Sequence, residues 1–153
     1  MTAASTIAIE DLPPHLGRDA RLLGLDVGTK TIGMALSDVT RSVATPFDTI
    51  GRTKFTADAK TIREVVEKYQ VGALVIGFPL NLDGSEGPRA QSTRAFASNL
   101  AAHVEVPMTT ALRRYRKARR GEAFPLLALH DHLRRHGPLD RRMRAPGNAV
   151  GGL

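Results

Sequence analysis

Asp26 is the only acidic residue in the apolar run of residues 22–27, and a Gly-Thr-Lys sequence follows that run directly. A lone carboxylate at the end of a buried strand is costly unless a cation or hydrogen-bond donors satisfy it. Mg²⁺ and Mn²⁺ take carboxylate oxygens together with water and substrate phosphate. Gly28, Thr29 and Lys30 offer backbone N–H groups, a hydroxyl and an ammonium to a phosphate. The segment predicts a metal-binding catalytic acid beside a phosphate-binding turn. The alternative is a turn acid that bonds the N–H groups of Gly28 and Thr29.

A second unusual segment, residues 77–87, reads Gly-Phe-Pro-Leu-Asn-Leu-Asp-Gly-Ser-Glu-Gly. In an α/β sheet, a buried strand delivers such a loop to the carboxyl edge, where these folds bind ligands. The loop then enters a helix N-terminus, which favours anions. We therefore interpret Asn81, Asp83 and Gly84 as candidate substrate contacts. The alternative is an ordinary strand–helix connection that Ser85 caps.

Two other groups of polar residues have weaker patterns. Asp38 ends an alternating apolar segment and is interpreted as a turn residue. His132 and His136, near His130, are spaced to share a helix face. A zinc site would need a third ligand, so we interpret these histidines as solvated.

Strands must position the first acid and its turn. Arg21–Val27 is a short apolar run, and apolar residues alternate with small or polar ones in Thr31–Ser37. The two segments therefore predict a hairpin. Val43–Ile50 predicts a third strand, at a sheet edge because it contains Pro46.

The next segments alternate between helix and strand. Apolar residues at helical spacing predict a helix over Ala57–Tyr69. Val71–Phe78 is apolar on both faces, as a buried parallel strand requires. Pro88 suits the first turn of a second helix, and Val104–Met108 predicts the start of another strand. This order predicts an α/β fold with a mixed central sheet flanked by helices.

The composition of this chain of 153 residues predicts one domain with a real core. A chain of such length buries roughly 68–70% of its unfolded surface. The absence of cysteine excludes disulfides and thiolate metal sites. There is no apolar run long enough to cross a bilayer, and residues 1–18 lack the pattern of a secretory signal. We therefore expect a cytoplasmic protein with no membrane partner.

The basic charge is confined to the last part of the chain. Residues 1–108 hold 11 Lys and Arg against 12 Asp and Glu, a net charge of −1. Residues 109–153 hold 11 Lys and Arg against 3 Asp and Glu, a net charge of +8. Such a block is typical of nucleic-acid contact.

Together, residues 23–33, Asp38 and residues 75–87 resemble the YqgF family, and the resemblance covers residues 21–108. Members of this family are pre-16S rRNA nucleases with an RNase H-like fold, also described as Holliday-junction-resolvase-like. The resemblance implies an endonuclease, dependent on Mg²⁺ or Mn²⁺, that trims the 5′ end of pre-16S rRNA during ribosome biogenesis. It also implies that Asp26 is the first metal-binding acid and that the partner is a ribosomal precursor.

The chain departs from this family after Met108. The family's second metal-binding acid lies in an Asp-Glu-Arg-(Leu/Phe)-(Ser/Thr)-Thr motif just after this strand, and a third acid lies on the C-terminal helix. Here no acid appears between Met108 and Glu122. Methionine has the single codon ATG and threonine codons begin AC, so the shifted frame across Met108 and Thr109 must read GAC, an Asp codon. The following codons permit Asp-Arg-Phe-Thr-Thr-Val.

We therefore divide the chain into an N-terminal extension, residues 1–20, an RNase H-like core, residues 21–108, and a basic C-terminal segment, residues 109–153. Our hypothesis is that a frameshift in the gene or its record produced the last segment. A segment that was not selected for this fold would leave the C-terminal part incomplete or irregular. The alternative is a diverged basic tail that grips RNA.

Three functions remain open at this point. The first is the metal-dependent nuclease, with weak or absent activity in this exact chain because one carboxylate rarely holds catalytic Mg²⁺ alone. The second is a Holliday-junction-resolvase-like endonuclease that acts on structured DNA. The third is a non-catalytic RNA-binding protein whose basic segment does the binding, with an affinity that falls steeply with salt.

Overall fold

The computed structural model describes residues 7–8, 11–41, 43–81 and 83–114. The predictions about the histidine group and most of the basic C-terminal segment therefore lie outside the described residues. None of the helices in the described ranges has the length and apolar character needed to cross a membrane.

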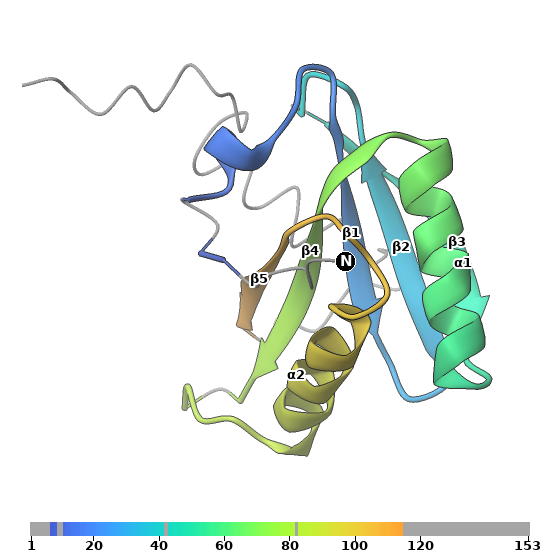
Figure 1. The fold of residues 1–153 in the computed structure, drawn as a ribbon. Coiled ribbons are helices and arrows are strands. Elements are labelled where there is room, and N and C mark those ends of the chain that lie inside the picture. The colour runs from blue at the N-terminus through green and yellow to red at the C-terminus, as the bar shows by residue number, and fades with distance from the viewer. Residues whose placement is uncertain (1–6, 9–10, 42, 82, 115–153) are drawn as a thin grey trace, which may run out of the picture.

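Five strands form one mixed sheet in the order β3-β2-β1-β4-β5 (Figure 1). The strands are β1 (Arg21–Val27), β2 (Thr31–Ser37), β3 (Ala44–Gly51), β4 (Val71–Leu80) and β5 (Met108–Arg114). The first three pair antiparallel as a meander, and β4 and β5 run parallel to β1. Parallel pairing needs crossover connections, and the two helices supply them.

Both helices pack on the same face of the sheet. They are α1 (Phe55–Lys68), between β3 and β4, and α2 (Pro88–Leu100), between β4 and β5. Leu23 and Leu25 of β1 lie in one buried cluster with Ile62 of α1 and Leu100 of α2. Successive strand residues point to opposite faces, so the residues between Leu23, Leu25 and Val27 lie on the other face.

A segment before β1 covers one end of that other face. Leu12 and Leu16, which flank a short 3₁₀ turn at Pro13–His15, are 0% and 1% exposed. They cluster with Leu22, Ala73 and Val75. A Cβ added to Gly72 would lie 2.7 Å from Ala20 Cβ and 3.2 Å from Leu16 Cδ2, so the segment approaches β4 closely. Leu12, Leu16 and Ala20 therefore anchor the predicted N-terminal extension to the core.

The predicted α/β fold with a mixed, helix-flanked sheet is confirmed. The hairpin strands agree residue for residue with the prediction, and β3, α1 and β4 differ from it by one or two residues at one or both ends. The last strand differs more. It begins at Met108, whereas the prediction started it at Val104, and it pairs with β4 as far as Arg114.

Candidate nuclease site

Asp26 lies near the carboxyl end of β1, on the face that the helices leave uncovered. Its side chain is half-buried. On β2 the residue paired with Asp26 is Gly33. On β4, Ile76 pairs with Leu25, so the next residue, Gly77, lies level with Asp26. Neither neighbouring strand therefore places a side chain beside the carboxylate at this level.

The turn after β1 is held from two sides. The Gly28 N–H donates to Thr31 O at 2.9 Å. In the turn-acid alternative, this N–H would bond the Asp26 carboxylate instead. Arg52, just after β3, donates through Nη1 to Gly28 O at 2.7 Å, and its backbone N–H donates to Lys30 O at 2.9 Å. Thr29 and Lys30 remain exposed. The turn is thus fixed at both ends while its tip is open to a ligand.

The loop after β4 is organised by its own polar groups. The Asn81 N–H donates to Ser85 O and the Gly84 N–H donates to Asn81 O, both at 2.9 Å. Asp83 Oδ1 accepts the Ser85 N–H at 2.8 Å and the Ser85 hydroxyl at 2.6 Å. The Asn81 amide donates to Ser85 Oγ at 3.1 Å. Gly84 has a φ of 85°, a conformation that favours glycine.

These bonds affect the charge of the loop. The hydrogen bonds from the Ser85 hydroxyl and N–H favour the ionised carboxylate and lower the pKa of Asp83 from its ordinary value. Asp83 therefore supports the loop conformation. Its role as a direct substrate contact, and those of Asn81 and Gly84, remain predictions.

The turn of residues 28–30 and the loop of residues 81–87 lie at the same end of the sheet (Figure 1). Both follow the carboxyl ends of the parallel neighbours β1 and β4. The structure thus brings together the two segments that the sequence singled out. Asp38 lies at the opposite end of β2, where its carboxylate accepts the Val43 N–H at 3.0 Å and the Thr40 hydroxyl, as expected of a turn residue.

The donor set for a divalent metal is incomplete. Within residues 7–8, 11–41, 43–81 and 83–114, no three His, Cys, Asp or Glu side chains come together as a metal site. The strand that would supply the second acid begins Met108-Thr109-Thr110-Ala111 and contributes none. Asp26 alone does not fit a Mg²⁺ or Mn²⁺ centre, which needs several oxygen ligands held by the protein and substrate.

Thr109 is a feature that the sequence analysis missed. It lies beside Val75 on the Asp26 face, is 1% exposed, and its hydroxyl has no hydrogen-bond partner in the described part of the chain. A buried unsatisfied hydroxyl costs roughly 1–3 kcal/mol. Such a mismatch is expected of a strand whose side chains were not selected for their place in the sheet.

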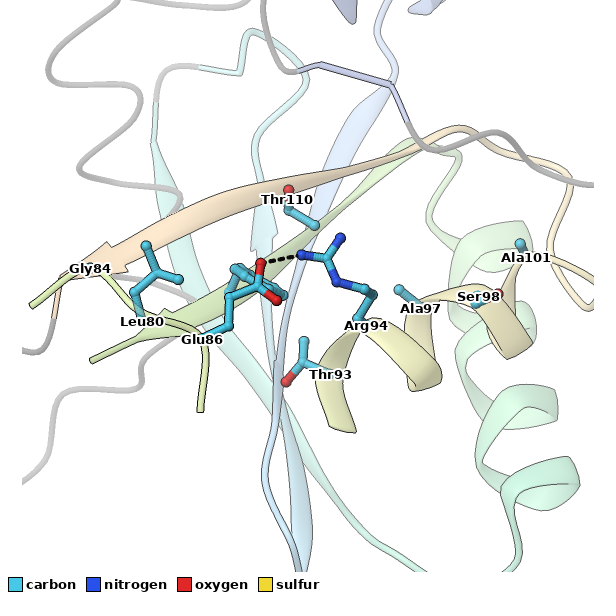
Figure 2. Close-up of a pocket in the computed structure, with 10 residues that line it drawn as sticks. Leu80, Gly84, Glu86, Thr93, Arg94, Ala97, Ser98, Ala101 and Thr110 are labelled. Atoms are coloured by element: carbon cyan, nitrogen blue, oxygen red, sulfur yellow. Dashed lines mark hydrogen bonds and ion pairs between the residues drawn. The ribbon is translucent and has the colours of Figure 1, made fainter. Parts of the chain in front are cut away.

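A cavity of about 580 Å³ lies on the opposite face, between β4, β5 and α2 (Figure 2). Phe78 and Leu80 line it together with Thr110, and the Arg94–Glu86 ion pair, with N···O 2.5 Å, spans it. Arg94 also lies 4.9 Å above the Phe78 ring. The cavity does not contain Asp26, because Phe78 belongs to the helix-covered face. The candidate chemistry therefore lies on the face of the sheet opposite the helices.

Comparison with known proteins identifies the family. Residues 20–115 match the family model RuvX, described as Holliday junction resolvase. The chain belongs to the RuvX family. This confirms the relationship that its motifs indicated under the name YqgF, and the match to RuvX ends one residue after β5.

Curated relatives agree with the RuvX match. A protein of Methylocella silvestris named "Putative pre-16S rRNA nuclease" is 55% identical over 105 residues, which are 69% of this chain and 65% of the relative. One of the same name from Paramagnetospirillum magneticum is 59% identical over 102 residues, or 67% and 66%. The chain thus spans just under two thirds of the length of these relatives. Among solved structures, T. thermophilus RuvC in complex with a Holliday junction substrate has a TM-score of 0.47 at 12% identity, covering 78% of this chain and 98% of that chain.

Proposed function

We propose that this RuvX-family gene encodes a nuclease that hydrolyses phosphodiester bonds of a ribosomal RNA precursor, in the maturation of the 16S rRNA 5′ end. The supporting observation is the placement of Asp26 on the sheet face opposite the helices, at the same end as the 28–30 turn and the 81–87 loop. Two relatives at 55% and 59% identity carry the name "Putative pre-16S rRNA nuclease", which supports an RNA substrate. In this proposal Asp26 is the metal-binding and catalytic acid. Gly28, Thr29, Lys30, Asn81, Asp83 and Gly84 contact the substrate.

We further propose that residues 109–153 are translated out of frame and that this exact chain cleaves weakly or not at all. Three observations support this. The described part of β5 supplies no acid, the Thr109 hydroxyl is buried without a partner there, and the RuvX match reaches only residues 109–115 of this segment. The frame-restored protein would supply the remaining acids for Mg²⁺ or Mn²⁺.

The decisive experiment compares this chain with a version whose frame is restored from the nucleotide sequence across codon 108. The substrates are a precursor 16S rRNA fragment and a four-way DNA junction, each with and without Mg²⁺. We expect Mg²⁺-dependent RNA cleavage by the restored protein only, and its loss in Asp26→Asn. Asp38→Asn is the matched control, because Asp38 lies at the far end of the sheet. Robust cleavage by the 153-residue chain, or full activity of restored Asp26→Asn, would refute the proposal.

The same assay separates the alternatives. Preferential cleavage of the four-way junction would favour the structured-DNA endonuclease, which the RuvX description supports. Mg²⁺-independent RNA binding that falls steeply with salt and disappears on deletion of residues 109–153 would favour a non-catalytic RNA-binding protein.

A further inference from the structure

Arg52 links the turn after Asp26 to the helix layer. Its Nη1 donates to Gly28 O at 2.7 Å and its backbone N–H donates to Lys30 O at 2.9 Å. Its guanidinium lies 5.5 Å from the centroid of the Phe96 ring on α2, and Phe96 is 4% exposed. A half-buried cation is thus held by an aromatic ring on one side and by the turn on the other.

These contacts constrain the direction of the turn's donors. In a trans peptide unit the C=O and the following N–H point in opposite directions. Because Gly28 O points at Arg52, the Thr29 N–H must point away from Arg52. A Cβ on Gly28 would also lie only 2.9 Å from Thr31 O, so the first residue of the turn has little freedom. Arg52 therefore determines how the exposed tip of the turn presents its N–H group.

We propose that Arg52 is a positioning residue that holds the turn of residues 28–30 in the conformation that receives a substrate phosphate. This inference rests on the proposed function, in which Thr29 and Lys30 contact the substrate. The guanidinium acts through its hydrogen bond to Gly28 and not mainly through its charge. Lys54 offers a matched comparison, because it is exposed at the same end of the sheet and its side chain does not cap α1.

The test uses the full 153-residue chain and a short RNA whose 2′-hydroxyls are methylated, so that cleavage plays no part. The variants are Arg52→Ala, Arg52→Lys, which keeps the charge but ends one atom short of the Nη1 donor, and Lys54→Ala. Hydrogen exchange of the Gly28 amide, which donates to Thr31 O at 2.9 Å, reports the order of the turn, and the RNA dissociation constant is measured across a range of salt. Circular dichroism and urea unfolding identify any variant that does not fold.

We expect Arg52→Ala to speed Gly28 exchange by about tenfold or more, since hydrogen bonds to charged groups are the stronger ones. It should weaken RNA binding by more than Lys54→Ala does. Arg52→Lys keeps the charge but not the Nη1 donor, so it should also speed the exchange and weaken RNA binding. Its salt slope should change by less than about 0.7, the value of one single-strand phosphate contact.

Two results would overturn the inference. If Arg52→Ala matches Lys54→Ala in exchange and affinity, or Arg52→Lys matches the wild-type chain in both, Arg52 contributes only charge. If Arg52→Ala loosens the turn but leaves RNA affinity unchanged, the turn does not bind phosphate. Failure of the proposed function has a separate signature: the wild-type chain would show no RNA binding, or binding that disappears on deletion of residues 109–153, and the inference would fall with it.

Discussion

Replacing Thr109 with valine should stabilise the protein. Valine has nearly the shape of threonine and exchanges the hydroxyl for a methyl group, so the replacement removes a polar atom that is buried without a partner among the described residues. Relief of an unsatisfied buried group amounts to roughly 1–3 kcal/mol. At 1% exposure there is little room for water to satisfy the hydroxyl. We therefore expect a gain of about 1–2 kcal/mol, allowing for imperfect fit of the new methyl.

A buried hydroxyl with partners supplies the control. Ser37 Oγ accepts the Leu22 N–H at 2.8 Å and donates to Asp38 O at 3.0 Å, and Ser37 is 2% exposed. Ser37→Ala leaves the Leu22 N–H without that acceptor and should cost roughly 1–3 kcal/mol. The two substitutions each remove one buried hydroxyl, and their effects should have opposite signs.

Urea unfolding at equilibrium measures both effects. The transition midpoint should rise for Thr109→Val and fall for Ser37→Ala, with an unchanged slope. A gain of about 1 kcal/mol corresponds to an increase of about 2–4 °C in the thermal midpoint for a protein of this size. If Thr109→Val is neutral or destabilising while Ser37→Ala behaves as expected, the Thr109 hydroxyl has a partner. Its burial then does not cost the free energy of unfolding that we assign to it.

Three other predictions concern separate parts of the fold. Leu12 is fully buried, so Leu12→Ala should cost about 2–5 kcal/mol in urea unfolding. A loss below about 0.5 kcal/mol, the size of an ordinary surface substitution, would mean that the segment before β1 is not part of the core. Gly28→Ala should weaken binding of 2′-O-methyl RNA, because its Cβ would lie 2.9 Å from Thr31 O, and Gly51→Ala, where nothing lies within 4 Å, should bind as wild type. The hydrogen bonds from Ser85 lower the pKa of Asp83, so they contribute order above the ordinary aspartate pKa of about 4 and lose it as the pH falls through the lowered value. The Ser85 amide shift, followed by NMR against pH, should report this transition, and a midpoint at the ordinary value would contradict it.

Local pattern was enough to predict the sheet and the position of the candidate acid. The alternation of Ile32, Met34 and Leu36 defines both the hairpin and its buried face, and this places Asp26 on the other face. The continuous apolar run of β4 marks a strand covered on both sides. These signals depend only on neighbours in the chain, so the sequence reveals them directly.

Contacts between distant residues were not predictable in this way. Leu12 and Leu16 have no periodic pattern around them, and only their packing on Leu22 and Ala73 shows that they belong to the core. Arg52 is one of many basic residues, and its link to Gly28 spans 24 positions. The cavity beside Phe78 is lined by residues of β4, α2 and β5, which are far apart in the chain. Each of these features depends on the tertiary arrangement, which sequence periodicity does not contain.

The parallel pairing of β5 with β4 continues for seven residue pairs, although the last six lie beyond the proposed change of frame. Ladder hydrogen bonds join main-chain groups, which every residue except proline supplies in full. Pairing at an edge strand therefore depends little on which side chains the segment carries. A frameshifted gene can thus encode a chain that completes its sheet yet lacks the side chains that its chemistry requires. Such a chain can bind a substrate without cleaving it.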